Sequence, residues 1–132
     1  MRARFEGERG AHEAENVVLG ARLAALAAPG ETIYVHGGGT ARGPLYIYSG
    51  REPAARYFFG TLHFYRGPRS VDETVAELRV APPAFIVDLT APRSSAPGQA
   101  SDFAGVYRTP AFEALLAERY ERAGGSFSGR DN

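Results

Sequence analysis

The sequence predicts a small three-layer α/β domain, Rossmann-like in general shape, with a mostly parallel central sheet. Apolar segments of strand length alternate with segments of helical periodicity along most of the chain. The run from Ala84 to Leu89 is apolar apart from Asp88, as expected of a strand covered on both faces. Strands that alternate with helices build a parallel sheet with right-handed crossovers.

The length of 132 residues indicates one domain. Residues 1–10 are polar and have no period, so we interpret them as a flexible lead-in. Residues 11–125 are predicted to form the single α/β domain, and residues 126–132 a polar tail.

The first helix is expected over residues 11–28. Leu19, Leu23 and Leu26 share one face at helical spacing, and Pro29-Gly30 should end the helix.

The first strand is expected over residues 31–36. Its alternation should turn Ile33 and Val35 to one side of the sheet and Tyr34 and His36 to the other.

An aromatic passage follows a glycine loop at residues 37–44. Leu45–Ser49 is predicted to be a short helix, and Arg56–Phe59 a second strand, with Gly60 at a bulge or bend.

Two more helices and a strand complete the prediction. Ser70 and Glu73 have the spacing of a capping box, so a helix should begin at Ser70 and end before Pro82-Pro83. Thr109-Pro110 should open the last helix, and Gly124-Gly125 should close it.

Composition excludes several classes of protein. The formal net charge is zero, which argues against a nucleic-acid binder that relies on bulk electrostatics. The chain has no cysteine, so neither a disulfide nor a thiolate metal site can form. Residues 1–10 are too charged for a signal peptide, and no apolar run approaches the ~18 residues of a membrane span. A freestanding protein of this kind would be cytoplasmic, without membrane insertion.

The passage Tyr46–Phe58, with the pattern Y-x-Y-S-G-R-x-P-A-x-R-Y-F, resembles the C-terminal soluble domain of multi-pass membrane glycosyltransferases. These enzymes are relatives of the dolichyl-phosphate-mannose–protein mannosyltransferases, and the bacterial members use a polyprenyl-phosphate sugar. The resemblance continues through Pro82–Asp88 and Leu115–Tyr120 and covers most of residues 12–122.

This resemblance implies an extracytoplasmic domain without catalytic residues or cofactors, because the family's catalytic carboxylates lie in loops of the membrane part. Such a domain would cover the active site, help bind the acceptor or the sugar-phosphate lipid, or mediate contact. The resemblance also implies one more strand after the last helix, for which Ser126–Asn132 is too polar.

The strongest candidate ligand site is the carboxyl end of the first strand, with His36 and Gly37, Gly38 and Gly39. The glycines could cradle a phosphate, although their spacing fits neither the dinucleotide nor the Walker fingerprint. They could instead form a tight turn after the strand, which we favour. His36 could be a general base or ligand contact, or a half-buried side chain bonded to a loop carbonyl, which we favour.

Asp88 would join His36 at the same edge if the two strands are parallel. A carboxylate at the end of a buried strand can be catalytic or can cap a helix, and no second carboxylate lies close in sequence. His63 lies among aromatic residues without a sequence neighbour that suggests a partner, and no metal site is predicted.

Arginines and tyrosines of the aromatic passage form a second candidate set. Arg51 and Arg56 with Tyr46 could bind a sugar phosphate, because guanidinium groups pair with phosphate. The arginines could instead stack on tyrosines and bridge to Glu52, holding the loop in place, and this structural interpretation is the more common one. For a site at the strand ends we rank Arg51 after His36 and the glycines, and Arg56 last.

Two alternatives to the glycosyltransferase domain remain open. The chain could be a freestanding α/β protein that binds or acts on a phosphorylated small molecule at the edge formed by His36 and Gly37–Gly39. It could also be an interaction protein that dimerises through exposed tyrosines and phenylalanines.

Overall fold

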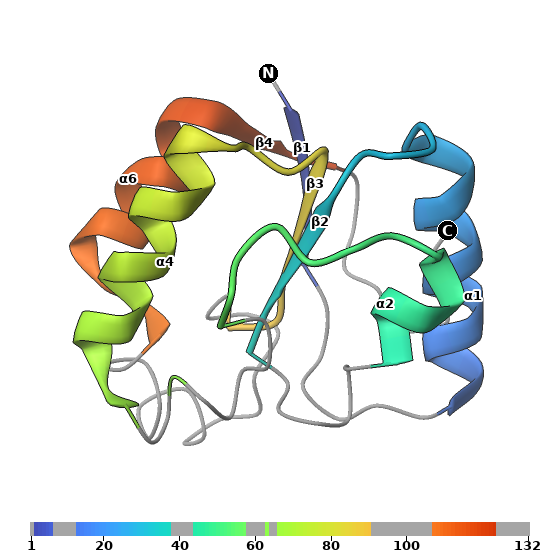
Figure 1. Cartoon of the computed structure of the whole chain (residues 1–132), viewed down its shortest axis with the longest axis horizontal. Coiled ribbons are helices and arrows are strands. Elements are labelled where there is room, and N and C mark those ends of the chain that lie inside the picture. The colour runs from blue at the N-terminus through green and yellow to red at the C-terminus, as the bar shows by residue number, and fades with distance from the viewer. Residues whose placement is uncertain are drawn as a thin grey trace.

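The structure, a computed structural model, describes residues 2–6, 13–37, 44–57, 63, 66–90 and 107–123. A four-stranded, all-parallel sheet lies between two layers of helices (Figure 1). The predicted fold class, a small α/β domain with a parallel sheet, is confirmed.

The sheet has the strand order β2-β3-β1-β4. The strands are β1 (Arg2–Glu6), β2 (Ile33–His36), β3 (Phe85–Asp88) and β4 (Tyr120–Arg122). Strands β1 and β3 therefore form the middle of the sheet, and β2 and β4 lie at its two edges.

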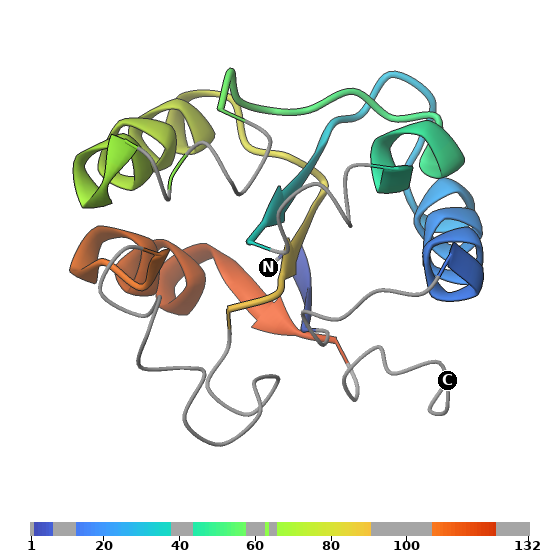
Figure 2. The same ribbon diagram turned by 90° about the horizontal axis from the view of Figure 1, so that it is seen from below.

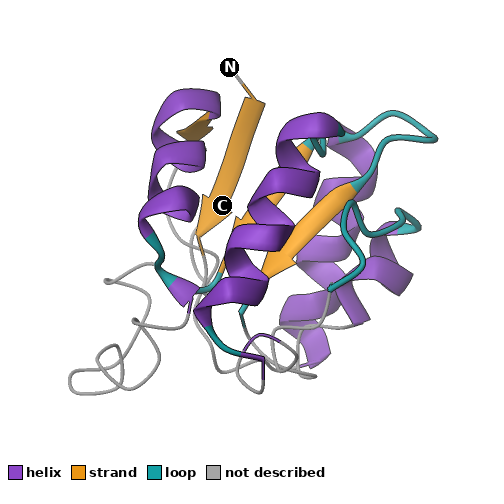
Figure 3. Cartoon of the chain, turned by 60° about the vertical axis from the view of Figure 1, so that its left-hand side comes forward, coloured by secondary structure: helices purple, strands orange, loops and turns teal. Residues whose placement is uncertain are grey.

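The helices are α1 (Glu13–Leu26), α2 (Pro44–Ser49), α4 (Pro68–Val80) and α6 (Pro110–Arg119). Helices α1 and α2 pack together on one face of the sheet, and α4 and α6 pack together on the other (Figure 2). The strands lie between these two helical layers (Figure 3). The short helix expected at Leu45–Ser49 is confirmed as α2.

The interpretation of residues 1–10 as a flexible lead-in is wrong for residues 2–6. They form β1, which pairs with β3 through Ala3 and Phe85 and with β4 through Arg2 and Tyr120. The sequence does not indicate this strand, because Phe5 is its only strongly apolar residue. The Phe5 side chain is buried in the core. Ladder hydrogen bonds on both sides stabilise a segment that its own side chains do not mark as a strand.

The last helix ends at Arg119, so the prediction that Gly124-Gly125 close it is wrong. Tyr120 leaves the helical conformation, and Tyr120–Arg122 become β4. The Tyr120 ring is buried, and its hydroxyl donates to the Pro83 carbonyl at 2.9 Å. This tertiary contact outweighs the helical period of the local sequence. The tail Ser126–Asn132 lies outside the described residues.

The strand expected at Arg56–Phe59 is wrong where the structure describes it. Residues 54–56 form bends and Tyr57 has no regular secondary structure, while Phe58, Phe59 and Gly60 lie outside the described part. Pro53 forms a single bridge to Ile33 at the outer edge of β2. Proline has no N–H to donate to a ladder, so the pairing ends there.

Helix α4 begins two residues before the predicted capping box. Gly67 is the cap residue, with φ of 85°, and Pro68 occupies the first turn. Ser70 therefore lies inside the first turn, where its hydroxyl reaches the Gly67 carbonyl at 2.8 Å. In α6 the predicted cap is confirmed, because Thr109 Oγ1 accepts from the Phe112 N–H at 3.2 Å.

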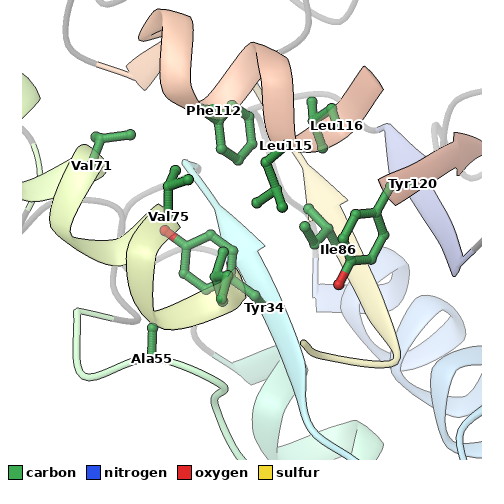
Figure 4. Close-up of a cluster of buried hydrophobic side chains, with 10 residues drawn as sticks. Tyr34, Ala55, Val71, Val75, Ile86, Phe112, Leu115, Leu116 and Tyr120 are labelled. Atoms are coloured by element: carbon green, nitrogen blue, oxygen red, sulfur yellow. The ribbon is translucent and has the colours of Figure 1, made fainter. Parts of the chain in front are cut away.

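Two apolar cores lie on the two faces of the sheet. Beneath α1 and α2 are the side chains of Phe5, Leu19, Leu23, Ile33, Val35, Leu45, Tyr46, Val87 and Leu89. Beneath α4 and α6 are Tyr34, Ala55, Val71, Val75, Leu78, Ile86, Phe112, Leu115, Leu116 and Tyr120 (Figure 4). The predicted alternation of β2, with Ile33 and Val35 opposite Tyr34, is thereby confirmed.

Within the described residues, no helix is both long enough and apolar enough to span a bilayer.

Candidate functional site at the carboxyl edge of the sheet

His36 and Asp88 end the neighbouring strands β2 and β3 and stand opposite each other in register. Because the strands are parallel, both residues lie at one edge of the sheet, as the sequence predicts. The helices α4 and α6 begin at this same edge (Figure 1). This carboxyl edge gathers most of the buried polar side chains of the described residues.

Asp88 is fully buried and its carboxylate is satisfied by three donors. Oδ1 accepts from the Thr90 N–H at 2.9 Å and from the Thr90 hydroxyl at 2.8 Å. Oδ2 accepts from Arg108 Nη1, and Arg108 Nε donates to Glu113 Oε1 at 2.8 Å. A carboxylate buried without such hydrogen-bond partners would be costly. Asp88 therefore fastens the turn after β3 to the segment that leads into α6.

His36 is fully buried against the ring of Phe112, with 3.9 Å between the ring centroids. Its Nδ1 lies 2.9 Å from the Tyr34 hydroxyl, and its Nε2 lies 3.0 Å from the Tyr107 carbonyl oxygen. Burial lowers the pKa of His36 to about 4, although the Asp88 charge opposes this shift. The favoured interpretation, a half-buried histidine bonded to a loop carbonyl, holds only in part: His36 bonds to a backbone carbonyl, but the histidine is fully buried and Tyr107 is helical.

His63 is the second buried histidine of this network. Its Nε2 lies 2.9 Å from the same Tyr34 hydroxyl, and its Nδ1 lies 2.9 Å from Ser70 Oγ. Burial lowers its pKa to about 4, so the imidazole is neutral at pH 7. The partners of His63 come from β2 and α4.

The chemistry of the donors and acceptors determines which group donates in each of these hydrogen bonds. A carbonyl only accepts, so His36 carries its proton on Nε2 and donates to Tyr107. Its Nδ1 then accepts from the Tyr34 hydroxyl, whose oxygen accepts from His63 Nε2. His63 Nδ1 in turn accepts from the Ser70 hydroxyl. With both imidazoles neutral, this assignment satisfies these four bonds. The single proton of the Ser70 hydroxyl then points to His63 and not to the Gly67 carbonyl, which lies 2.8 Å away.

Gly37 follows His36 with φ of +84°, and an added Cβ would lie 2.6 Å from Thr90 Cγ2. The position therefore requires glycine both for its backbone conformation and for its close approach to the turn after β3. This fits the interpretation of a tight turn after the strand. Gly38 and Gly39 lie outside the described residues.

Tyr46 lies on α2 and reaches the outer edge of β2. Its hydroxyl accepts from the Val35 N–H at 2.9 Å. The backbone of the following segment covers the same edge, because the Ile33 N–H donates to Glu52 and the Ala54 N–H donates to Ile33. An edge strand needs such partners for its outward-facing backbone groups.

Arg51 lies beyond the amino end of β2, away from His36. Its Nη2 donates to the carbonyls of Ala24 at 3.0 Å and Ala27 at 2.8 Å, and its Nη1 donates to Ser49 at 3.1 Å. The guanidinium thus binds the carbonyl ends of α1 and α2. The structure does not bring it to the carboxyl edge, where the sequence ranked it second.

Arg56 is 65% exposed and lies against α4. Its Nε donates to Glu77 Oε2 at 2.8 Å, and its guanidinium carbon lies 5.0 Å from the centroid of the Tyr57 ring. The interpretation in which arginines stack on tyrosines and hold the loop fits Arg56, with Glu77 rather than Glu52 as its carboxylate partner.

A surface hollow of about 320 Å³ lies beside the histidine network. Its lining includes Arg66, Arg69, Ser70 and Glu73. Arg66 lies over the Tyr57 ring, at 4.8 Å from its centroid, and Arg69 pairs with Glu73 at 4.0 Å. Across the described ranges, no group of three or more histidine and carboxylate side chains could hold a metal ion.

Four residues at the carboxyl edge are not among the site residues that the sequence predicts: Tyr34, His63, Ser70 and Arg108. Tyr34 carried a usable signal, since it shares a strand face with His36. The other three come from segments whose positions depend on the packing of α4 and α6.

The fold and the site define a parallel α/β domain whose buried polar groups bind one another at the carboxyl edge of the sheet. Comparisons with family models, curated proteins and solved structures found no match to this chain.

Proposed function

We propose that this chain is a non-catalytic accessory domain of a polyprenyl-phosphate-sugar glycosyltransferase, located on the extracytoplasmic side of the membrane. Its role would be to help the parent enzyme recognise its acceptor or its sugar-phosphate lipid. The proposal rests on the resemblance carried by Tyr46–Phe58 and on the way that this passage is used.

One observation carries the proposal: the described residues of that passage hold the fold together. Tyr46 binds the edge of β2, Arg51 binds the carbonyl ends of two helices, and Arg56 binds α4. Contacts of this kind stabilise the fold, and they favour a structural role for this passage over a catalytic one. The buried titratable groups at the carboxyl edge are likewise bonded to one another.

The first test is genetic and biochemical. The reading frame that encodes the chain should contain a series of membrane-spanning helices before Met1. In that enzyme, replacing Arg51 with alanine should loosen the domain and raise KM for the acceptor, with kcat little changed. An Arg56→Ala enzyme is the matched control, because Arg56 is exposed. Equal loss of kcat in both variants, or a reading frame without such helices, would overturn the proposal.

The second candidate is a binder of phosphorylated small molecules at the carboxyl edge. The hollow beside Ser70, with two arginines in its lining, favours this candidate. A titration with glucose 1-phosphate, followed by backbone amide shifts, separates the two candidates. Saturable shifts at Gly37, Arg66 and Arg69 would support the second candidate, and no shift at millimolar ligand would remove it.

A further inference from the structure

The histidine network joins parts of the chain that are far apart in sequence. Tyr34 and His36 come from β2, Ser70 from α4, and Tyr107 from the segment before α6. Two imidazoles share one tyrosine hydroxyl, with distances of 2.9 Å on both sides. The bonds hold His63 and Tyr107 to the sheet, and the proposed function does not use them.

The network can take up one proton without losing a hydrogen bond. If His63 becomes an imidazolium, its Nδ1–H donates to Ser70 Oγ. The Ser70 hydroxyl then rotates and donates to the Gly67 carbonyl, which lies 2.8 Å away. His63 Nε2 continues to donate to Tyr34, so the remaining bonds keep their direction.

A second proton cannot be taken up in the same way. It would have to sit on His36 Nδ1, which then becomes a donor to the Tyr34 oxygen. The Tyr34 hydroxyl would face donors on both sides, and its own proton would lose its acceptor among the described residues. The two imidazolium rings would also repel each other, because their centroids are only 5.6 Å apart.

The charged surroundings do not relieve this conflict. Asp88, from β3, is the carboxylate that favours a charged His36, but Arg108 already binds it. The Arg108 charge itself disfavours a charged His36. The titratable groups around the two imidazoles come from β2, β3, α4 and the segments beside α4 and α6: Tyr34, Asp88, Glu77, Tyr57, Tyr107 and Arg108.

We propose that Ser70, His63, Tyr34 and His36 form an acid-sensitive clasp. The clasp holds His63 and Tyr107 to the carboxyl edge of the sheet while both imidazoles are neutral. It tolerates a single proton at His63, and it opens when His36 is protonated as well. Opening exposes this edge while the four-stranded sheet stays intact.

The first experiment measures the tautomers of both rings by nitrogen-detected NMR of the intact chain at pH 7. The clasp requires the proton on Nε2 in His36 and in His63. His36→Gln and His63→Gln assign the two signals. A ring with its proton on Nδ1, or a pKa near the ordinary 6.5 for either histidine, would overturn the proposal.

The second experiment measures hydrogen-exchange protection between pH 7 and pH 4. The Gly67 and Ser70 amides, which bond to His63 and Gly67 carbonyls, report on the clasp. Their protection should fall below pH 6 with a slope that approaches about tenfold per pH unit for each histidine released. The Val87 amide, in the middle of the sheet, should keep its protection over the same range.

Two variants sharpen this result. His63→Gln removes one titrating group, so the slope at Gly67 should fall by about tenfold per pH unit. Tyr46→Phe removes a buried tyrosine hydroxyl on the opposite face, where it accepts from the Val35 N–H, and should leave the slope unchanged. An unchanged slope in His63→Gln, or equal loss of protection at Val87, would show that acid unfolds the chain without opening a clasp.

Discussion

At the scale of single residues, the described site depends on positions where another amino acid could not adopt the same backbone conformation or make the same hydrogen bonds. Gly37 is the clearest case, because its backbone has a positive φ and an added Cβ would lie 2.6 Å from Thr90 Cγ2. Tyr34 is another, because one hydroxyl serves two histidines. Substitutions at such positions should cost more than the size of the change suggests.

Gly37→Ala should lower the free energy of unfolding by about 2 kcal/mol or more, because it adds backbone strain to a collision with Thr90. Gly50→Ala is the matched control, since Gly50 has φ of +65° and no atom within 4 Å of an added Cβ. Urea unfolding followed by circular dichroism measures both. Equal losses in the two variants would show that the close approach to Thr90 contributes nothing.

At the scale of elements, the sequence predicted those whose signals are local. Thr109 and Pro110 mark the start of α6, and Leu45–Ser49 form the expected short helix. The elements that it missed, β1 and β4, are defined by pairing with distant strands. Each contains one buried aromatic ring among charged residues, so neither has the apolar content of a typical strand.

Phe5→Ala tests whether β1 is part of the core. Removal of this buried ring should lower the free energy of unfolding by about 3–5 kcal/mol, close to the whole stability of a marginal domain. Val80→Ala is the control, because Val80 is 87% exposed and its loss should change stability by less than about 0.5 kcal/mol. A small effect of Phe5→Ala would restore the interpretation of residues 1–10 as a lead-in.

Arg51→Lys tests how the ends of α1 and α2 are held. A lysine cannot reproduce the fork that binds Ala24, Ala27 and Ser49 together, so about 1–3 kcal/mol should be lost. Arg56→Lys changes an exposed ion pair that solvent screens, so it should cost less stability than Arg51→Lys. Thermal unfolding of both variants gives the comparison, and a larger loss in Arg56→Lys would contradict this assignment.

At the scale of the whole molecule, the sequence located the candidate site and its strand-end residues His36 and Asp88, but not the side chains that bond to them. Parallel strands bring His36 and Asp88 to one edge whatever the details of packing, so their meeting could be predicted. The hydrogen bonds of His63 and Arg108 depend on how α4 and α6 pack on the sheet. The sequence prediction placed Arg51 too close to the carboxyl edge for the same reason. Its partners are determined by the positions of α1 and α2 and not by the strand order.

The stability of the whole chain should rise with pH between about 4 and 6.5. The pKa values of His36 and His63 are about 4 in the folded chain, below their ordinary 6.5. The unfolded chain therefore binds more protons in this window, and stability is lost as the pH falls through it. Each histidine contributes on the order of 3 kcal/mol at most.

Urea midpoints at pH 7 and pH 5 measure this dependence. His63→Gln should reduce the difference between the two midpoints by about half, because one of two titrating groups is gone. A midpoint that does not change between pH 5 and pH 7 would mean that the histidines are not held neutral in the folded chain.

The strand order also dictates when the sheet can form. Strand β1 lies between β3 and β4, so its first residues pair with Phe85 and Tyr120, which are far away in the chain. Contacts between such distant residues require the closure of long loops, which slows folding. On the ribosome, β1 is made before both of its partner strands and must therefore wait until β4 has been made. Until then Phe5 has no completed sheet to enter, and a chaperone that binds short apolar segments would have a long opportunity to bind β1.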